Sequence, residues 1–249
     1  HLDGRHTVFG RVTDGLDIAR SLNKDDEIIE FQEKPKTSKS NLASMGIYLF
    51  NMDLLKEVLT GIKQEDLDFG KHIIPHLIKT TSKEVYAYQF KDYWMDVGTY
   101  DSYLDTNIAM TKDFTDLDLY DPTWKVFTKS EDLPPVKVGS EAVVHNSLVS
   151  NGSVIEGTVI NSVLSPGVRV GKGAVIKDSV VLNNSIIGEN VTIENSVVGP
   201  HVTLSAGSTV TNSILKNSIV YENTTIENEV ISSSMIGNDV KLKGQMKEV

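Results

Sequence analysis

Aliphatic residues return every five or six positions along the C-terminal half of the chain. This spacing differs from the period of 3.6 in an amphipathic helix and from the period of 2 in a half-buried strand. It is typical of stacked β-coils, in which each short strand contributes one inward side chain. The repeated residues are Val149, Val154, Val159, Leu164, Val170, Ile176, Val181, Ile187, Ile193, Val198, Leu204, Val210, Leu215, Val220, Ile226, Ile231, Ile236 and Leu242. With three faces per coil they predict about six coils, more than the roughly three that a solenoid needs for a continuous core.

Small and polar residues separate these aliphatic positions, as at 171–173 and 188–190. Gly, Asn, Ser and Thr form tight corners, and Gly and Asn tolerate left-handed backbone dihedrals. The pattern resembles the left-handed parallel β-helix of hexapeptide repeats. We therefore assign residues 138–249 to such a β-helix.

The preceding part of the chain has the mixed periods of an α/β segment. Strands are expected at 26–31, in the second half of 41–50, at 85–90 and at 93–97. Helices are expected at 52–59, at 68–78 with an interruption at Pro75, and at 100–110. These elements define a segment of residues 25–110, and a proline-containing connector of residues 111–137 joins it to the β-helix. Residues 1–24 form an atypical N-terminal segment.

Composition limits the classes of function. The chain has 249 residues, a formal charge of −10 and no cysteine. The negative charge opposes binding to nucleic acid or to an anionic membrane, and a chain without cysteine has neither disulfides nor thiolate metal sites, which suits a cytoplasmic protein. No stretch approaches the roughly 18 apolar residues of a membrane span, and the first residues do not form a signal peptide. Because there is no initial methionine, we expect the chain to begin inside a longer reading frame.

Five motifs stand in the order found in bacterial ADP-glucose pyrophosphorylases, and the chain resembles this family. They are Phe31-Gln32-Glu33-Lys34-Pro35, Ser44-Met45-Gly46-Ile47-Tyr48, Asp68-Phe69-Gly70-Lys71 with Ile73-Ile74-Pro75, Tyr93-Trp94 with Asp96-Val97-Gly98-Thr99, and Asp121-Pro122 with Trp124. The resemblance implies that residues 25–110 are the sugar-phosphate-binding half of an α/β nucleotidyltransferase domain. It also implies the reaction of glucose 1-phosphate with ATP to ADP-glucose and pyrophosphate, in glycogen synthesis. In such a transfer the protein supplies positioning and charge neutralisation.

The resemblance also assigns roles to individual residues. Glu33 and Ser44 would bind glucose hydroxyls, which suits an accepting carboxylate and a hydroxyl that donates and accepts. Lys34 would bind the sugar phosphate as a compact cation and take part in catalysis. Asp96 would be catalytic as a ligand of Mg²⁺, a hard cation that prefers carboxylate oxygen. Its neighbour Met95 departs from the basic residue often found there in the family.

Each role has a structural alternative. Glu33 and Lys34 could be an exposed charge pair at the end of a strand. Ser44 could serve only the turn before Gly46, and Asp96 could cap the helix that follows Gly98 and Thr99.

Three histidine and lysine side chains are expected to have no catalytic role. Lys71 and His72 are interpreted as helix surface, and His201 as a corner residue rather than the general base that hexapeptide acyltransferases use.

Two features of this family are missing from the sequence. The family opens with a Gly-rich loop ending in Arg, whose backbone amides hold the triphosphate, and it has a further Asp in the metal site. We therefore expect the nucleotide-binding half to be absent and the chain alone to be inactive.

Both ends of the chain depart from the central resemblance. Residues 1–20 resemble a late stretch of the cyclophilin barrel, whereas Phe9-Gly10 and Thr13-Asp14 also suit the pyrophosphorylase strand. At the other end, residues 198–202 and 233–240 resemble the β-helical tails of long sugar-1-phosphate thymidylyltransferases. The choice between the two N-terminal resemblances stays open.

Two classes of function follow. The first is a glucose-1-phosphate nucleotidyltransferase with glucose 1-phosphate, ATP and Mg²⁺ as partners. The second is a noncatalytic β-helix module that drives assembly and retains a residual sugar-phosphate site. In both, the coil edges predict a homo-oligomer, because unpaired strand edges are commonly covered.

Overall fold

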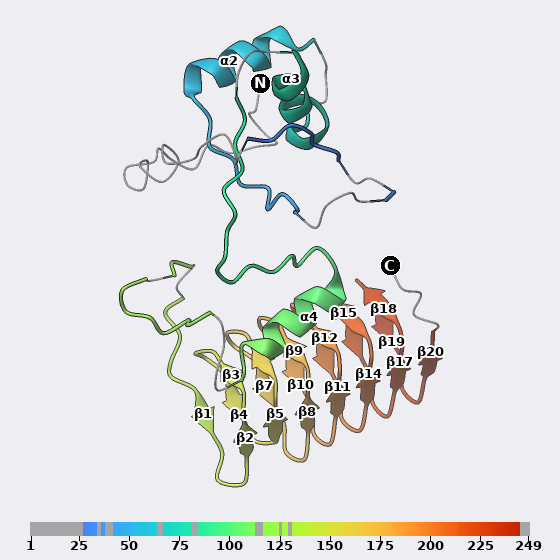
Figure 1. Cartoon of the computed structure of the whole chain (residues 1–249). Helices are drawn as coiled ribbons and strands as arrows, with labels where there is room; N and C mark the ends of the chain where they lie inside the picture. The colour runs from blue at the N-terminus through green and yellow to red at the C-terminus, as the bar shows by residue number, and fades with distance from the viewer. Residues whose placement is uncertain are drawn as a thin grey trace. The chain divides into compact units, whose positions relative to one another are not determined.

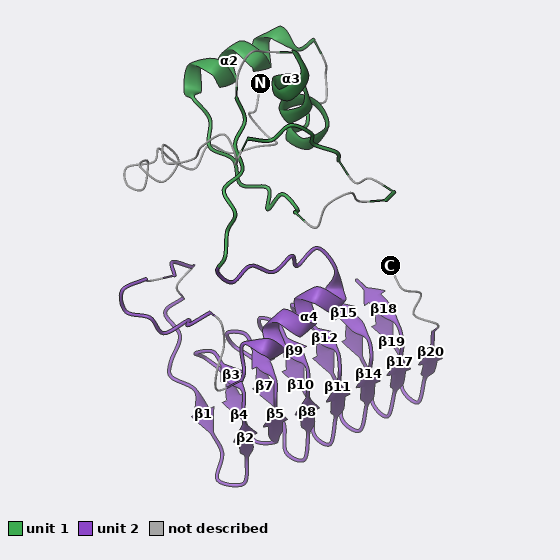
Figure 2. Cartoon of the chain, viewed as in Figure 1, with its two compact units in different colours: residues 1–91 green, residues 92–249 purple. Residues whose placement is uncertain are grey.

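The computed structural model describes residues 27–33, 36–37, 42–63, 67–80, 84–112, 117–124, 126–128 and 131–244 (Figure 1). The chain divides into two compact units, His1–Lys91 and Asp92–Val249 (Figure 2). None of the helices in the described ranges is long and apolar enough to cross a membrane.

Helices form the core of the first unit. They are α2 (Met52–Gly61), η2 (Phe69–Ile73) and α3 (Ile74–Thr80). Asn51 caps α2, because its side chain accepts hydrogen bonds from the backbone N–H groups of the first turn. Val58 of α2 packs against Ile73 and Leu77, and these three side chains are buried. The helix predicted at 52–59 is therefore confirmed.

The helix predicted at 68–78 forms with a different geometry. Its first turn, η2, is π-helical, with the backbone N–H of Ile73 bonded to the carbonyl of Asp68 at 3.2 Å. Pro75 follows as the second residue of α3. Proline lacks the N–H that would bond four residues back, and its ring crowds that carbonyl. A wider turn just before it accommodates this, so the helix changes type near Pro75 instead of breaking there.

None of the four strands predicted in the first part of the chain forms a regular strand among the described residues; residue 26 of the first one lies outside them. Among the described residues of this region only one bridge forms, antiparallel between Glu27 and Tyr86, with the Ile28 N–H bonded to the Val85 carbonyl at 2.7 Å. The other described residues of the four predicted strands belong to no strand.

The second unit is built on a parallel β-helix with three sheets, as predicted (Figure 1). The first sheet contains, in order, β1 (Lys137–Val138), β4 (Val154–Ile155), β7 (Arg169–Val170), β10 (Ile186–Ile187), β13 (Thr203–Leu204), β16 (Ile219–Val220) and β19 (Met235–Ile236). The second contains β2 (Val143–His145), β5 (Thr158–Ile160), β8 (Val175–Lys177), β11 (Thr192–Glu194), β14 (Thr209–Thr211), β17 (Thr225–Glu227) and β20 (Lys241–Lys243). The third contains β3 (Leu148–Val149), β6 (Val163–Leu164), β9 (Val180–Val181), β12 (Val197–Val198), β15 (Ile214–Lys216) and β18 (Val230–Ser232).

The predicted inward residues form the core of this β-helix, with one exception. All but Val154 belong to a single hydrophobic cluster or pack against it, and Ile155 takes the place of Val154. Four positions separate Ile155 from Val159, whereas six separate Val170 from Ile176 at the same corner one coil later. The shorter corner passes through Gly157, where an added Cβ would lie 2.5 Å from the Ala174 carbonyl oxygen and 2.7 Å from that of Gly171. A residue with a side chain does not fit there.

A column of left-handed residues, five Asn and one Asp, builds the corner between the second and third sheets. Asn146, Asn161, Asp178, Asn195, Asn212 and Asn228 have φ between 46° and 56°, a left-handed conformation that Asn and Asp adopt more readily than other side chains. A serine follows each of them except Asn228, which Glu229 follows. These serines link successive coils: the Ser162 hydroxyl, for example, donates to the Ile160 carbonyl at 2.6 Å and accepts from the Ser179 N–H at 3.2 Å. The same bond continues from Ser179 to the N–H of Ser196 at 3.1 Å.

One helix covers an outer face of the β-helix. Helix α4 (Tyr100–Ala109) lies along the third sheet, where its Leu104 packs against Val180 and Val197 (Figure 1). Both valines point outward from their strands and are nevertheless buried. The helix predicted at 100–110 is thus confirmed, and its apolar face packs within the second unit. The predicted boundaries of the four segments stay predictions.

Candidate sugar-phosphate site

The carboxylate of Glu33 lies against the backbone of the η2 turn. A Cβ placed on Gly70 would lie 3.2 Å from the Glu33 Cδ and closer still to its Oε2. Gly70 is buried, whereas Glu33 is exposed. The absence of a side chain at Gly70 therefore lets the Glu33 carboxylate take this position.

Ser44 is joined to the same turn through two aromatic rings. Its Oγ lies 3.0 Å from the Tyr48 hydroxyl and accepts the Gly46 N–H at 3.2 Å. The Tyr48 ring stacks on Phe69, with centroids 5.6 Å apart and planes 20° from parallel. Ser44 thus has the turn role considered as its alternative and is also held beside Tyr48.

The η2 turn therefore contacts Glu33 directly and is linked to Ser44 through Tyr48. Phe69 stacks on Tyr48, and the Tyr48 hydroxyl is hydrogen bonded to Ser44. The next residue, Gly70, lies against the carboxylate of Glu33. Carboxylate, hydroxyl and phenol groups beside an aromatic ring suit a ligand with several hydroxyl groups and an apolar face. Tyr48, Phe69 and Gly70 belong to two of the five motifs, but the resemblance assigned none of them a role. Tyr48 lies four residues after Ser44, which could have indicated it.

Asp68 fixes the start of this turn. Its Oδ1 accepts the Lys71 N–H at 2.7 Å, and its own N–H donates to His72 Nδ1 at 3.0 Å. The hydrogen bond from the Lys71 backbone is the main cause that lowers the pKa of Asp68, in spite of an opposing contribution from desolvation. His72 was interpreted as helix surface, but one ring nitrogen is a hydrogen-bond acceptor within the turn.

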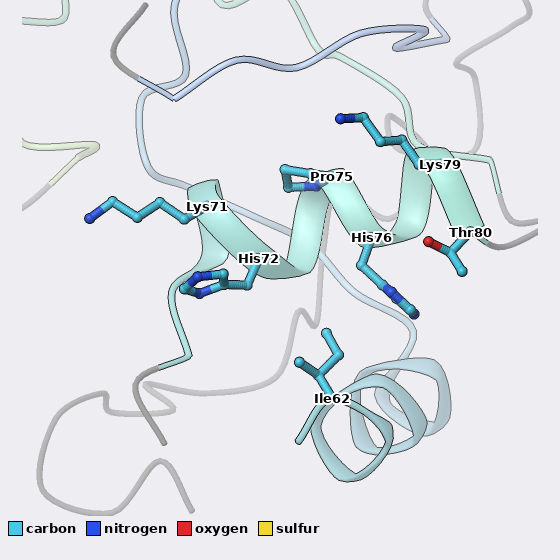
Figure 3. Close-up of a pocket in the computed structure, with 7 residues that line it drawn as sticks. All are labelled: Ile62, Lys71, His72, Pro75, His76, Lys79 and Thr80. Atoms are coloured by element: carbon cyan, nitrogen blue, oxygen red, sulfur yellow. The ribbon is translucent and has the colours of Figure 1, made fainter. Parts of the chain in front are cut away.

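A hollow of about 280 Å³ lies beside η2 and α3. It is lined by Ile62, Lys71, His72, Pro75, His76, Lys79 and Thr80 (Figure 3). The Lys71 and Lys79 side chains point away from Ile62 in this view (Figure 3). Glu33 and Ser44 are not among the lining residues, so the hollow does not coincide with the predicted glucose ligands.

Asp96 lies on an exposed loop of the second unit. Its Oδ1 accepts the Gly98 N–H at 3.1 Å. The cap of α4 is Thr99, which forms a capping box with Ser102, so the alternative role of Asp96 as the helix cap is wrong. A carboxylate held in this way fits one oxygen ligand of Mg²⁺, which commonly takes one or two protein carboxylates together with phosphate and water. Within the described ranges, no group of three or more His, Cys, Asp or Glu side chains is placed to hold a metal ion.

Two further residues complete the account of the predicted site. Lys34 lies outside the described residues. His201 occupies a left-handed corner with φ of 55° and is exposed, in line with the corner role expected for it.

Two family models match the chain. Residues 3–113 match that of nucleotidyl transferases, and residues 134–212 match the GlmU-like C-terminal hexapeptide. A nucleotidyltransferase segment followed by a hexapeptide β-helix is thereby confirmed. The first match includes most of residues 1–24, which supports a nucleotidyltransferase alignment for that segment.

Curated relatives agree with these models. The glucose-1-phosphate adenylyltransferase of Acetivibrio thermocellus is 45% identical over 170 residues, which are 67% of this chain and 40% of that protein. The enzymes of the same name from Thermosipho melanesiensis and Geobacillus stearothermophilus are 49% and 46% identical, over 61% and 63% of this chain and 37% and 41% of their own lengths.

This chain is similar to glucose-1-phosphate adenylyltransferases. The resemblance drawn from the five motifs is therefore confirmed. The chain spans about two fifths of the length of the curated adenylyltransferases it matches.

Proposed function

We propose that the chain carries the sugar-phosphate half of a glucose-1-phosphate adenylyltransferase, which converts glucose 1-phosphate and ATP into ADP-glucose and pyrophosphate for glycogen synthesis. The observation that carries the proposal is the convergence of Glu33, Ser44 and Tyr48 on the Phe69-Gly70 turn. The similarity to adenylyltransferases supports the choice of sugar and nucleotide. The predicted location remains the cytoplasm.

The binding chemistry follows from the groups present. The Glu33 carboxylate accepts hydrogen bonds from two glucose hydroxyls, and the Ser44 and Tyr48 hydroxyls both donate and accept. The ring pair of Tyr48 and Phe69 offers an apolar face to the sugar. Lys34 neutralises the phosphate.

The transfer itself needs little covalent help from the protein. An oxygen of the sugar phosphate attacks the α-phosphorus of the nucleotide, and pyrophosphate leaves; the chain contributes by holding the attacking phosphate in place. Mg²⁺, with Asp96 as one carboxylate ligand, would offset the negative charge of the phosphates. We expect the nucleotide side of the site to require residues beyond those of this chain.

A second candidate is a noncatalytic assembly module. Three strands at the end of the β-helix, β18, β19 and β20, each close one sheet and have no further partner strand among the described residues. Outward-facing Ile186, Ile219 and Met235 of the first sheet lie in register with Thr203 and are 47%, 39% and 70% exposed. These features favour contact with a second copy, and therefore a homo-oligomer.

Titration calorimetry with glucose 1-phosphate tests the proposal. The full chain should bind the sugar phosphate, and Lys34→Ala should weaken binding about 10- to 150-fold, because a hydrogen bond to a charged group contributes roughly 1.5–3 kcal/mol. Lys71→Ala is the matched control, since it removes an exposed ammonium but keeps the backbone N–H that Asp68 accepts. A wild-type chain that does not bind glucose 1-phosphate, or equal losses in the two variants, would contradict the proposed site.

A further inference from the structure

We infer that His72 is a positioning residue for the sugar site, because its Nδ1 closes the turn that carries Phe69 and Gly70. The inference rests on the proposed function, since it assigns that turn to glucose 1-phosphate binding. His72 itself is not placed against the sugar.

The turn is closed at Asp68 by two reciprocal hydrogen bonds. The Asp68 carboxylate accepts the Lys71 N–H at 2.7 Å, and the Asp68 N–H donates to the His72 ring at 3.0 Å. This is the logic of a capping box, in which the cap residue and a side chain of the first turn satisfy each other's backbone N–H groups. Here the returning acceptor is an imidazole four residues after the cap.

The residues inside this closure are the ones that meet the sugar ligands. Phe69 stacks on Tyr48, and Gly70 lies against the Glu33 carboxylate. Glu33 is exposed, and its carboxylate rests against the backbone of Gly70. A shift of the turn therefore moves the stacking partner of Tyr48 and the surface on which Glu33 rests at the same time.

The hydrogen bond from the Asp68 N–H requires an acceptor at the side chain of residue 72. The ring nitrogen must be unprotonated to accept, so the bond assigns the proton of a neutral imidazole to Nε2. An asparagine Oδ1 stands three bonds from Cα, as Nδ1 of histidine does, and can take over the acceptor role. Leucine has the same branching as asparagine and cannot accept.

The experiment compares the full-length wild-type chain with His72→Asn and His72→Leu. Calorimetry with glucose 1-phosphate should give affinities within twofold of wild type for His72→Asn and about two- to tenfold weaker for His72→Leu. Amide hydrogen exchange should show the Asp68 N–H protected in the wild type and in His72→Asn but faster in His72→Leu. If His72→Leu does not fold, His72→Gln replaces it, because its acceptor lies one bond farther from the backbone and should give intermediate values.

The outcomes separate the two claims. Unchanged Asp68 exchange in all variants, or equal affinity losses in His72→Asn and His72→Leu, overturns the role of His72. A wild-type chain that binds no glucose 1-phosphate overturns the proposed function, and the exchange experiment then still decides whether His72 closes the turn.

Discussion

Replacing Gly70 by alanine should separate sugar binding from stability. The new Cβ would lie 3.2 Å from the Glu33 Cδ and closer to Oε2, while ordinary contacts between carbon atoms are about 3.5–4.0 Å. The colliding group is the end of an exposed, flexible side chain, so the carboxylate can move aside by about 1 Å. The backbone of the turn does not need to change.

The two free-energy effects have opposite signs. Alanine in place of glycine within a helix stabilises the fold by about 0.5–1 kcal/mol, so the variant should unfold at the same or a slightly higher temperature. The displaced Glu33 carboxylate, however, loses hydrogen bonds that contribute roughly 1.5–3 kcal/mol each when a charged group is involved. Glucose 1-phosphate affinity should fall about 10- to 150-fold.

Gly61→Ala is the matched control. Gly61 is the last residue of α2, and nothing lies within 4 Å of a Cβ placed on it. This variant should also keep or raise the unfolding temperature, but its affinity should equal that of the wild type. Calorimetry and thermal unfolding on the three proteins decide the matter: a Gly70→Ala affinity within twofold of wild type would refute the placement of Glu33 against this turn.

Three further predictions concern the β-helix and the cap of the turn. Ile187→Ala should destabilise the β-helix by about 2–5 kcal/mol, because Ile187 is 1% exposed. Ile186→Ala on the same strand should have almost no effect, because Ile186 is 47% exposed. Equal shifts of the melting temperature in circular dichroism would argue against the assigned core. Ser179→Ala should cost about 1–3 kcal/mol by leaving a buried backbone N–H without its acceptor, while Ser234→Ala, at the exposed end of the β-helix, should cost little in the same assay. Because the pKa of Asp68 is lowered, its ionised form stabilises the first unit above the ordinary pKa near 3.8, and this stabilisation is lost as pH falls through the lower pKa of the folded state. Asp68→Asn should remove this contribution to the pH dependence of the unfolding free energy in urea titrations. An unchanged pH dependence would contradict the prediction.

The N-terminal strands failed as sequence predictions for a physical reason. An alternating pattern shows that a segment could be extended, but a strand exists only where a second segment supplies ladder hydrogen bonds. The strand pairing between residues 27–33 and 84–90 is limited to the Glu27–Tyr86 bridge. The helices depend on local bonds and caps, so α2 and α4 could be predicted from nearby residues alone.

The motifs identified the candidate site only in part. Glu33 and Ser44 were found from their motifs, but their common location depends on contacts with Phe69 and Gly70, which come from a later segment. The acceptor role of His72 depends on the π-helical turn, which the sequence did not predict.

The sequence by itself determined the β-helix, because every coil repeats the same local demand: an inward aliphatic residue, then a corner that Gly or Asn can turn. The tertiary structure alone decided which of the adjacent residues Val154 and Ile155 faces inward, because a shift of one residue exchanges the two faces of a strand and the spacing pattern fits either residue. It also decided the outer face. Val180 and Val197 read as surface positions in the repeat, yet α4 buries them, because side chains from a distant part of the chain cover that sheet.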